Sequence, residues 1–364
     1  MAIRLRLTSK EQEIFDIICQ NPQISQDELA SKLGITRSSV SVHISSLIKK
    51  KYIEGKGYII NNKNKVVIIG ASMVDIVGIS NDILVENDSN PGRIRLNAGG
   101  AARNVAENLA HLDTHVTLIT AICNDSLGEV IKNSCLLSQI DITDALYVDG
   151  GITTTYMAVL SKDGELALGV SDTEAIDNIS IEFIQKKQHV INSGEIVMLD
   201  ATLSEDVIAY LLENFPSTNM YVETVSLAKA QKIKPYLSSI NMLKCSRTEL
   251  GYLVDIKIVD EQDIVKGVNT LHRLGIEKVI VTIGNSKIYY SDHSYSGFKT
   301  FDGVKVVNET GAKDSFMAGY LYGELNGYDI ERSIEIASKM LVMTLSDQDT
   351  VSKKINANKI KERA

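Results

Sequence analysis

Apolar and polar residues follow two different patterns along the chain, and the change falls near residue 65. Between residues 9 and 48 the apolar positions recur every three or four residues, which predicts three short helices. From residue 65 onward, continuous apolar runs such as KVVIIG and KVIVTIG alternate with amphipathic runs. This second pattern is typical of βαβ units, in which helices cover both faces of a doubly wound, mainly parallel sheet. We therefore predict a small domain at residues 1–64 and a larger α/β domain at residues 65–364.

The small region carries the start and stop signals of a helix-turn-helix unit. Ser9, Ser25 and Thr36 are placed to cap the three helices, and Gly34 ends the second one. The residues LGIT form the turn between the second and third helices, and KYIEGKGYII predicts a small β-wing. We expect apolar stripes at Ile14, Phe15, Ile17 and Ile18, at Leu29 and Leu33, and at Val40, Ile44, Leu47 and Ile48.

This stretch resembles the winged helix-turn-helix domains of bacterial regulators. The resemblance implies that the third helix enters the major groove of double-stranded DNA. The residues implied at bases are Arg37, Ser38, Ser39 and Ser41, and those implied at phosphates are Lys49, Lys50, Lys51 and Lys56. Because one such unit reads few bases, we expect a homodimer that contacts two half-sites. An oligomerisation arm with a solvated, lysine-rich helix end is the alternative.

Two extended segments interrupt the α/β alternation, at about residues 79–97 and 151–172. The tripeptides NPG and KDG predict turns within them. Both segments would project from the sheet edge as a small β lid. A lid is useful where water must be kept away from a phosphoryl donor.

Composition and charge narrow the possible classes of protein. No apolar run approaches the ~18 residues of a membrane span, so we expect no membrane partner. The formal net charge of -8 divides into +5 for residues 1–65 and −13 for the remainder, which suggests different partners for the two parts. The cysteines lack C-x-x-C spacing, which argues against a disulfide framework or a zinc site and favours a reducing cytoplasm. They are Cys19, Cys123, Cys135 and Cys245.

Two short stretches early in the α/β region place polar groups at chain turns. Asp75 follows the first predicted strand, where its carboxylate could accept hydrogen bonds from substrate hydroxyls or could simply close a turn. Gly99 and Gly100 open a predicted helix, and Asn104 follows one turn later. The glycines allow close backbone approach, and Asn104 can both donate to and accept from a polyol. A plain helix start explains the same residues.

The stretch NETGAKDSF places an aspartate at the start of another predicted helix. The N–H groups of Gly311, Ala312 and Lys313 would point outward, with the positive end of the helix dipole behind them. Asp314 could then take a proton from an attacking hydroxyl while those N–H groups hold charge on a transferred phosphoryl group. The alternative is an aspartate that only complements the helix dipole. Neither a P-loop nor a dinucleotide fingerprint occurs in the chain.

The order GxxxxD, AGGxxxN and TGAxD resembles the ribokinase-like, or phosphofructokinase-B type, family of sugar and nucleoside kinases. The resemblance covers residues 66 to about 355, and DSNPGRI, AGGAARNVAENLAHL and TTTYMAVL are most similar to pseudouridine kinases. It implies a ribokinase-like fold with a β lid, ATP and Mg²⁺ as cofactors, and a monovalent cation such as K⁺ as a further candidate.

The resemblance also implies roles for individual residues. Asp314 would be the general base, and Gly311, Ala312 and Lys313 would form the anion hole. The residues implied near the ribose are Asp75, Gly99, Gly100 and Asn104, with Asn90 and Tyr156 of the lid nearby. Those implied for ATP are Thr282, Gly284, Ser246 and the 345–352 loop, and those implied for magnesium, through water, are Glu223 and Glu249.

Four positions depart from the family pattern, all on the phosphate and metal side. Lys313 and Lys287 replace glycines, Ser246 replaces an asparagine, and Glu223 stands where aspartate is frequent. The Lys313 ammonium could attract the γ-phosphate, or it could pair with Asp314 and depress the pKa of that carboxyl.

Two hypotheses for the function follow. The first is an ATP-dependent kinase of the primary hydroxyl of a ribosyl nucleoside or sugar, with pseudouridine favoured and a DNA-binding head. The second is a transcription regulator whose degenerate kinase domain senses a sugar or nucleoside with little or no turnover. The retained aspartates favour the first, and the departures with the DNA-binding head favour the second.

Overall fold

A computed structural model describes residues 7–21, 24–53, 65–284, 286–301, 303–304 and 306–361. The chain forms two compact units, Met1–Lys63 and Asn64–Ala364. Most of the expected β-wing, KYIEGKGYII, falls on residues 54–60, which include Lys56 and lie outside the described residues.

The first unit contains three helices in the described ranges, which are α1 (Ser9–Gln20), α2 (Gln26–Leu33) and α3 (Arg37–Lys49). Ser25 and Thr36 cap α2 and α3, which confirms two of the expected caps. The expectation for Ser9 is wrong, because Thr8 caps α1 and forms a capping box with Glu11.

The core of this unit lies between the three helices. Ile14, Ile18 and Leu29 are fully buried, and α3 contributes Val40, Ile44 and Leu47. Ile48 was expected on the buried stripe but is 42% exposed. It follows the fully buried Leu47 by one residue and lies at the edge of the buried stripe of α3.

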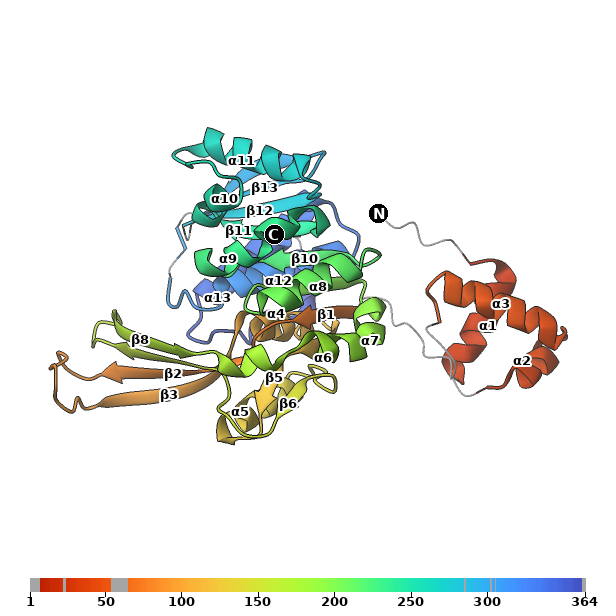
Figure 1. Ribbon diagram of the computed structural model, residues 1–364, viewed down its shortest axis with the longest axis horizontal. Helices are drawn as coiled ribbons and strands as arrows, with labels where there is room; N and C mark the ends of the chain where they lie inside the picture. Colours follow the sequence, from red (N-terminus) through yellow and green to blue (C-terminus); the bar gives the residue numbers. More distant parts are fainter. Residues whose placement is uncertain are drawn as a thin grey trace. The chain divides into compact units, whose positions relative to one another are not determined.

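The second unit is built on an eight-stranded sheet with strand order β14-β13-β12-β11-β10-β9-β1-β4 (Figure 1). Pairing is parallel from β12 to β4, and β13 and β14 add an antiparallel edge. The strands are β1 (Lys65–Ile69), β4 (His115–Ile119), β9 (Ile196–Asp200), β10 (Met220–Glu223), β11 (Met242–Ser246), β12 (Lys278–Ile283), β13 (Lys287–Ser291) and β14 (Ser296–Thr300).

Helices cover both faces of this sheet, because alternate strand residues enter two separate apolar clusters. One face carries α4 (Ala101–Ala110), α5 (Ser126–Leu137), α12 (Ala312–Leu325), α13 (Ile330–Leu345) and α14 (Ala357–Lys361). The other carries α6 (Ile181–Lys186), α7 (Gln188–Ser193), α8 (Glu205–Asn214), α9 (Leu227–Ile233), α10 (Arg247–Leu253) and α11 (Glu261–Arg273). Short elements complete the unit: β5 (Ala121–Cys123), β6 (Leu146–Val148), η1 (Glu174–Asn178) and η2 (Lys234–Ser239).

A second sheet with strand order β3-β2-β7-β8 projects from this body as the lid (Figure 1). Its strands are β2 (Met73–Ser80), β3 (Gly92–Gly99), β7 (Thr155–Leu160) and β8 (Leu166–Asp172). The lid begins earlier than expected, because MVDIVGIS pairs along its whole length with β3 and over residues 74–79 with β7. Asp75 therefore lies inside a lid strand and not in a turn after β1.

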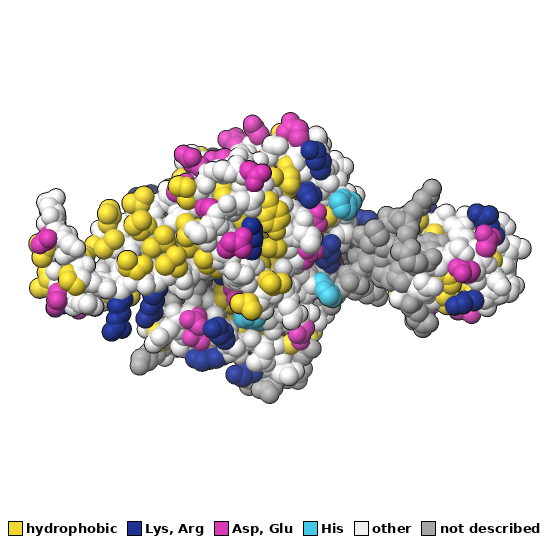
Figure 2. All heavy atoms as spheres, turned by 90° about the horizontal axis from the view of Figure 1, so that it is seen from below, with side chains coloured by type: hydrophobic (Ala, Val, Ile, Leu, Met, Phe, Trp, Pro, Cys, Tyr) yellow, Lys and Arg dark blue, Asp and Glu magenta, His cyan; other side chains and the backbone are white. Residues whose placement is uncertain are grey.

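The two faces of the lid differ in chemistry. Asp75 is paired with Asn97 and Tyr156, so these three side chains share one face, which we call the site face. The opposite face, called the outer face, carries exposed aliphatic side chains, and Figure 2 shows apolar side chains gathered over the projecting sheet. The exposed residues of the outer face include Ile94, Leu96, Met157, Leu168 and Val170.

Within the described ranges, no helix combines the length and apolarity needed to cross a bilayer. The same part of the chain contains no group of three or more His, Cys, Asp or Glu side chains arranged to hold a metal ion. All four cysteines are free thiols, of which Cys19 is exposed and the others are buried.

Candidate active site

The carboxyl ends of the central strands face the start of α12. Gly311 precedes this helix with φ of 80°, and no side chain caps the helix start. A Cβ at Gly311 would lie 2.0 Å from the backbone oxygen of Thr350, so only glycine fits this left-handed, closely packed position. The local sequence thus leaves a helix N-terminus open for an anion beside Asp314.

A chain of hydrogen bonds orients Asp314. The Asn104 amide Nδ2 donates to Asp314 Oδ2 at 2.7 Å, and Asn104 Oδ1 accepts from Arg103 Nη2 at 2.5 Å. Because Arg103 occupies the amide oxygen, the amide nitrogen is the atom that faces the aspartate. The structure therefore brings together Asp314 and Asn104, which lie 210 positions apart in the chain.

Arg103 is a positioning residue that the sequence patterns did not single out. Its side chain is 1% exposed, and it donates to the Gly99 oxygen, to Glu107 and to Ser134 Oγ. The available signal was a charged residue between the apolar positions of an otherwise buried helix face. Arg103 ties the glycine turn to α4 and fixes the rotamer of Asn104.

Electrostatics make Asp314 a weak acid for an aspartate. Burial, and secondarily the negative charge of Glu223, raise the pKa of Asp314 to about 6, while Lys244 and the Asn104 hydrogen bond oppose this shift. A carboxyl with such a pKa is ionised at neutral pH yet basic enough to accept a proton.

Lys244 is a second residue that the patterns missed. It is buried on β11, and its ammonium forms an ion pair with Glu223 Oε1 on the neighbouring strand β10. Glu223 Oε2 is buried and has no hydrogen-bond partner among the described residues. Glu249, on α10, accepts hydrogen bonds from Thr224 Oγ1 and from the Ser246 N–H.

Asp75 lies at the inner end of the lid. Burial raises its pKa to about 6, and the charge of Arg103 opposes that shift. A Cβ at Gly99 would lie 2.1 Å from Asp75 Oδ2, so a side chain at this position would displace the carboxylate. Gly100, with φ of 94°, follows as the N-cap of α4. The paired glycines thus let Asp75 and the start of α4 approach each other closely.

Asn90 is not brought to this group. Its side chain bonds to the Val85 N–H and to the oxygens of Val85 and Asp88, which closes the loop at the far end of the lid. Tyr156 is placed beside Asp75 as expected, and Asn97 is an additional polar residue at the same level. The period-two alternation of β3 was the signal that could have identified Asn97.

A pocket lies beside the open start of α12. Thr282 and Gly284 line it together with Ala312 and Lys313, and Leu345 completes the wall. Ser246 is the register partner of Thr282, and its hydroxyl caps α10 in a box with Glu249. The expected nucleotide residues therefore gather at one end of the sheet.

The two lysines of this region differ in their partners. Lys313 is exposed and lines the pocket, whereas Lys287 forms an ion pair with Glu261 and covers the Phe298 ring. The interpretation in which Lys313 depresses the pKa of Asp314 is not supported, because that pKa is raised and Lys244 is the strongest opposing cation.

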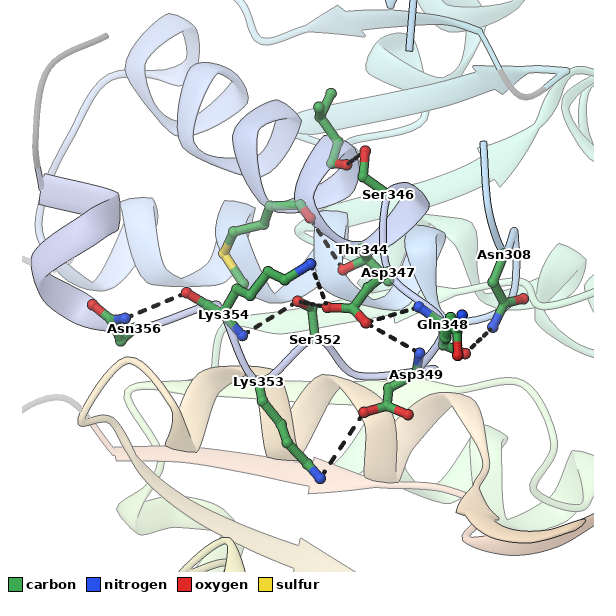
Figure 3. A network of polar contacts seen from close by, with 12 residues as sticks. Asn308, Thr344, Ser346, Asp347, Gln348, Asp349, Ser352, Lys353, Lys354 and Asn356 are labelled. Carbon is green, nitrogen blue, oxygen red and sulfur yellow. Dashed lines mark hydrogen bonds and ion pairs between the residues drawn. The ribbon is translucent and has the colours of Figure 1, made fainter. Parts of the chain in front are cut away.

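The loop at residues 345–352 is held against residues 307 and 308, which lie shortly before α12 (Figure 3). Asn308 Nδ2 donates to the Gln348 oxygen at 3.1 Å, and the Val307 N–H donates to the Leu345 oxygen at 2.7 Å. Within the loop, Asp347 accepts hydrogen bonds from Ser352 Oγ and from the Gln348 N–H. Hydrogen bonds thus link the loop that forms one wall of the pocket to the segment that leads into α12.

In the first unit, α3 presents its polar side to solvent. Arg37, Ser38, Ser39, Ser41 and Lys49 are all exposed. Lys50, however, forms an ion pair with Glu11 at 2.7 Å, and a phosphate contact of Lys50 stays a prediction.

Val42 is an exposed apolar residue that the patterns missed on α3. It is 68% exposed and lies on the same helix side as Ser38, Ser41 and Ser45. On a recognition helix, an apolar side chain of this kind can contact the methyl group of thymine.

Comparisons with known proteins agree with this geometry. A sequence model described as pfkB family carbohydrate kinase matches residues 63–354, and one described as winged helix-turn-helix DNA-binding matches residues 7–54. An uncharacterized sugar kinase, YeiI, of Escherichia coli strain K12 is 31% identical over 332 residues, covering 91% of this chain and 92% of that protein. The pseudouridine kinase of the same strain is 31% identical over 289 residues, covering 79% of this chain and 92% of that protein.

Solved structures share the fold of the second unit. The structure of Arabidopsis thaliana ribokinase complexed with ribose and ATP aligns with a TM-score of 0.71 at 16% identity. The alignment covers 83% of this chain and 100% of that chain.

Proposed function

The chain belongs to the pfkB family of carbohydrate kinases and carries a winged helix-turn-helix domain before the kinase, and from this premise we propose that it phosphorylates the primary hydroxyl of pseudouridine. That it is an ATP-dependent kinase of a sugar or nucleoside follows from the family and from its kinase relatives. The choice of pseudouridine is supported by the pseudouridine kinase that is 31% identical to it. The observation that carries the proposed chemistry is Asp314, held by Asn104 beside an open helix start.

The proposed reaction is an in-line transfer of the γ-phosphoryl group. The substrate hydroxyl oxygen attacks the γ-phosphorus, the bond from that phosphorus to the bridging oxygen breaks, and ADP leaves. The hydroxyl proton passes to Asp314, whose raised pKa suits a general base. The N–H groups at the start of α12 hold the negative charge of the phosphoryl oxygens.

Substrate and cofactor groups fit the remaining residues. The Asp75 carboxylate would accept hydrogen bonds from the ribose hydroxyls, and the Asn104 amide nitrogen would donate one to them. The unpartnered, buried Oε2 of Glu223 suits a hydrogen bond from a magnesium-bound water, and Glu249 would take a second one. Magnesium, when bound, would neutralise phosphate charge. A requirement for K⁺ stays a prediction.

Release of ADP with a panel of nucleosides and sugars tests the proposal. Asp314→Asn should lower turnover of pseudouridine by about 10²- to 10⁴-fold, because the proton acceptor is lost. Asp206→Asn changes an exposed aspartate on α8, across the sheet from α12, and should leave turnover unchanged. Equal activity of wild type and Asp314→Asn would refute the proposed role of Asp314.

A sensor without turnover is the second candidate, and the four altered phosphate-side residues favour it. Lys244 neutralises Glu223, and Lys287 is already paired, so two of these positions are engaged within the protein. The outcome expected of a sensor is thermal stabilisation by a nucleoside or sugar with no ADP formed from any of them.

We further propose that the first unit binds double-stranded DNA through α3. The exposed Arg37 and the three serines near it support this, and so does the match to winged helix-turn-helix DNA-binding domains. For the full chain, affinity for a selected DNA site should fall steeply with salt, and Arg37→Ala should weaken it about 10-fold. Lys257→Ala, an exposed lysine in the kinase unit, is the control. Affinity for DNA that does not change with salt would rule out this role.

A homodimer is proposed to form through the outer face of the lid. Ile94 is 72% exposed and Leu168 61% exposed, and such a continuous aliphatic surface is costly to leave in water. A second copy is the favoured occupant, because a helix-turn-helix unit needs a partner to read two half-sites. Light scattering of the full chain should give twice the mass of one chain. The variant Leu168→Lys should give the mass of a single chain. Val259→Lys changes an exposed residue outside the lid and should leave the dimer intact. A dimer that persists in Leu168→Lys would place the interface elsewhere.

A further inference from the structure

The site face of the lid carries two arginines that the proposed reaction does not use. Val77 is paired with Arg95, and Ile79 with Arg93, in the same alternation that pairs Asp75 with Asn97. Both arginines therefore lie on the same face of the sheet as Asp75, at successive steps toward the tip of the lid. Both are exposed, and neither forms an ion pair with any residue in the described part of the chain.

On the site face, the residues across the sheet from Arg95 are apolar or glycine, and together they form what we call the floor. At this level the neighbouring strands contribute Val77, Ala158 and Gly169, which are register partners across the lid. A Cβ at Gly169 would lie 2.7 Å from Tyr156 Oη, so the Tyr156 side chain leans over the glycine. Arg95, on β3, and the Tyr156 hydroxyl, over β8, thus lie on opposite sides of Val77 and Ala158.

The length of a nucleoside matches this arrangement. In the proposed function, the primary hydroxyl lies at Asp314 and the ring hydroxyls lie near Asp75. The base is attached to the ribose carbon remote from the primary hydroxyl, so it would extend outward along the lid strands. One step along a strand on the same face is about 6.6 Å, which places the base at the level of Arg95 and Ala158.

We propose that Arg95 is a specificity-determining residue that selects a nucleoside whose base carries carbonyl oxygens, and that Tyr156 stacks on the same base. This inference rests on the proposed function and names its substrate class. The guanidinium group offers several N–H donors and no acceptor, so it pairs with carbonyl oxygens and not with amino groups. Pseudouridine and inosine present such carbonyl oxygens. Adenosine has an amino group and ring-nitrogen acceptors but no carbonyl oxygen on its base, and free ribose has no base.

The small floor favours a base over an anionic group as the partner of Arg95. A phosphate or carboxylate needs charge and hydrogen-bond donors around it. Across the sheet, the partners of Arg95 on this face are Val77, Ala158 and Gly169, which offer neither, and only Asn97 and Arg93 flank it along β3. A planar ring, in contrast, gains from contact with Tyr156 and with an apolar surface.

Calorimetric titration of the full chain tests the inference without relying on turnover. Wild type should bind pseudouridine and inosine more tightly than adenosine or ribose. Arg95→Ala should weaken pseudouridine binding by about 10- to 100-fold, the effect of losing a charge-assisted hydrogen bond, and should leave ribose binding unchanged. Arg95→Lys keeps the charge but loses the planar donor pair, so it should recover only part of the affinity.

Arg93→Ala is the matched control, because it removes the same side chain one step farther out on the same face. It should change pseudouridine affinity less than 2-fold, within about 0.4 kcal/mol. The inference is overturned if Arg95→Ala leaves pseudouridine binding intact, or weakens pseudouridine and ribose equally. It is also overturned if wild type binds no nucleoside. A phosphorylated sugar, fructose 1-phosphate, is the probe for an anionic partner, and the inference fails if both arginine variants lose affinity for this probe alone.

The outcomes separate this inference from the proposed function. Arg95-dependent binding of pseudouridine without ADP release would retain the inference and refute the kinase proposal for this substrate. Turnover of pseudouridine at equal kcat/KM in wild type and Arg95→Ala would do the reverse.

Discussion

At the scale of single residues, two carboxyl groups of the site are unusually weak acids. Burial raises the pKa of both Asp75 and Asp314 to about 6, and the proposed reaction needs each as a carboxylate. Because both become protonated as the pH falls through 6, log kcat/KM should fall below that pH with a slope of about two. In Asp75→Asn the slope should drop to about one. A profile that stays flat down to pH 5 would contradict these ionisations.

Asn104 is the residue whose removal should shift that profile. Its amide stabilises the carboxylate of Asp314, so Asn104→Ala should raise the pKa of Asp314 further and move the limb of the profile to higher pH. Loss of a hydrogen bond to a charged group should also lower kcat/KM by about 10- to 100-fold at neutral pH. Asn269→Ala, an exposed residue on α11, should change neither quantity. An unshifted profile in Asn104→Ala would mean that this contact does not tune the base.

At the scale of elements, the start of α12 depends on the packing of the 345–352 loop against Gly311. A methyl group there would meet the Thr350 oxygen at 2.0 Å, so Gly311→Ala should displace the loop and lower kcat/KM at least about 100-fold. Gly327→Ala is a matched control, because its φ of 71° imposes similar backbone strain in open space. The control should lose about 1–2 kcal/mol of unfolding free energy but keep its activity. Equal activity losses in the two variants would show that strain, and not the loop, is responsible.

Elements were predictable where local chemistry determines them. The caps Ser25 and Thr36, the turn at Gly34 and the alternating strands and helices all depend on residues close in sequence, and they are confirmed. Asn90 shows the limit of this approach. An asparagine amide can close a loop or bind a substrate, and only the strand register places Asn90 far from Asp75.

Contacts between distant residues could not be predicted. Lys244 and Arg103 lie on buried faces, where a charged residue is explained only by the partner that tertiary folding brings to it. The effect of Lys313 on the pKa of Asp314 could not be predicted either, because it depends on which cation the fold places nearest that carboxyl.

At the scale of the whole molecule, the fold class, the family and the presence of a winged helix-turn-helix domain agree with the sequence prediction. The two proposed activities, nucleoside phosphorylation and DNA binding, belong to one chain, so the effect of a nucleoside on DNA affinity can be measured directly. By linkage, a nucleoside that changes DNA affinity must itself bind with an affinity that DNA changes by the same factor.

The most direct test of the account is identification of the product formed by the full chain with ATP, Mg²⁺ and pseudouridine. Phosphorus NMR and mass spectrometry should reveal pseudouridine phosphorylated on its primary hydroxyl, formed in equal amount with ADP, and both should disappear in Asp314→Asn. Thermal stabilisation by pseudouridine with no phosphorylated product from it, or from any other nucleoside or sugar tried, would contradict the account and leave a sensor in its place.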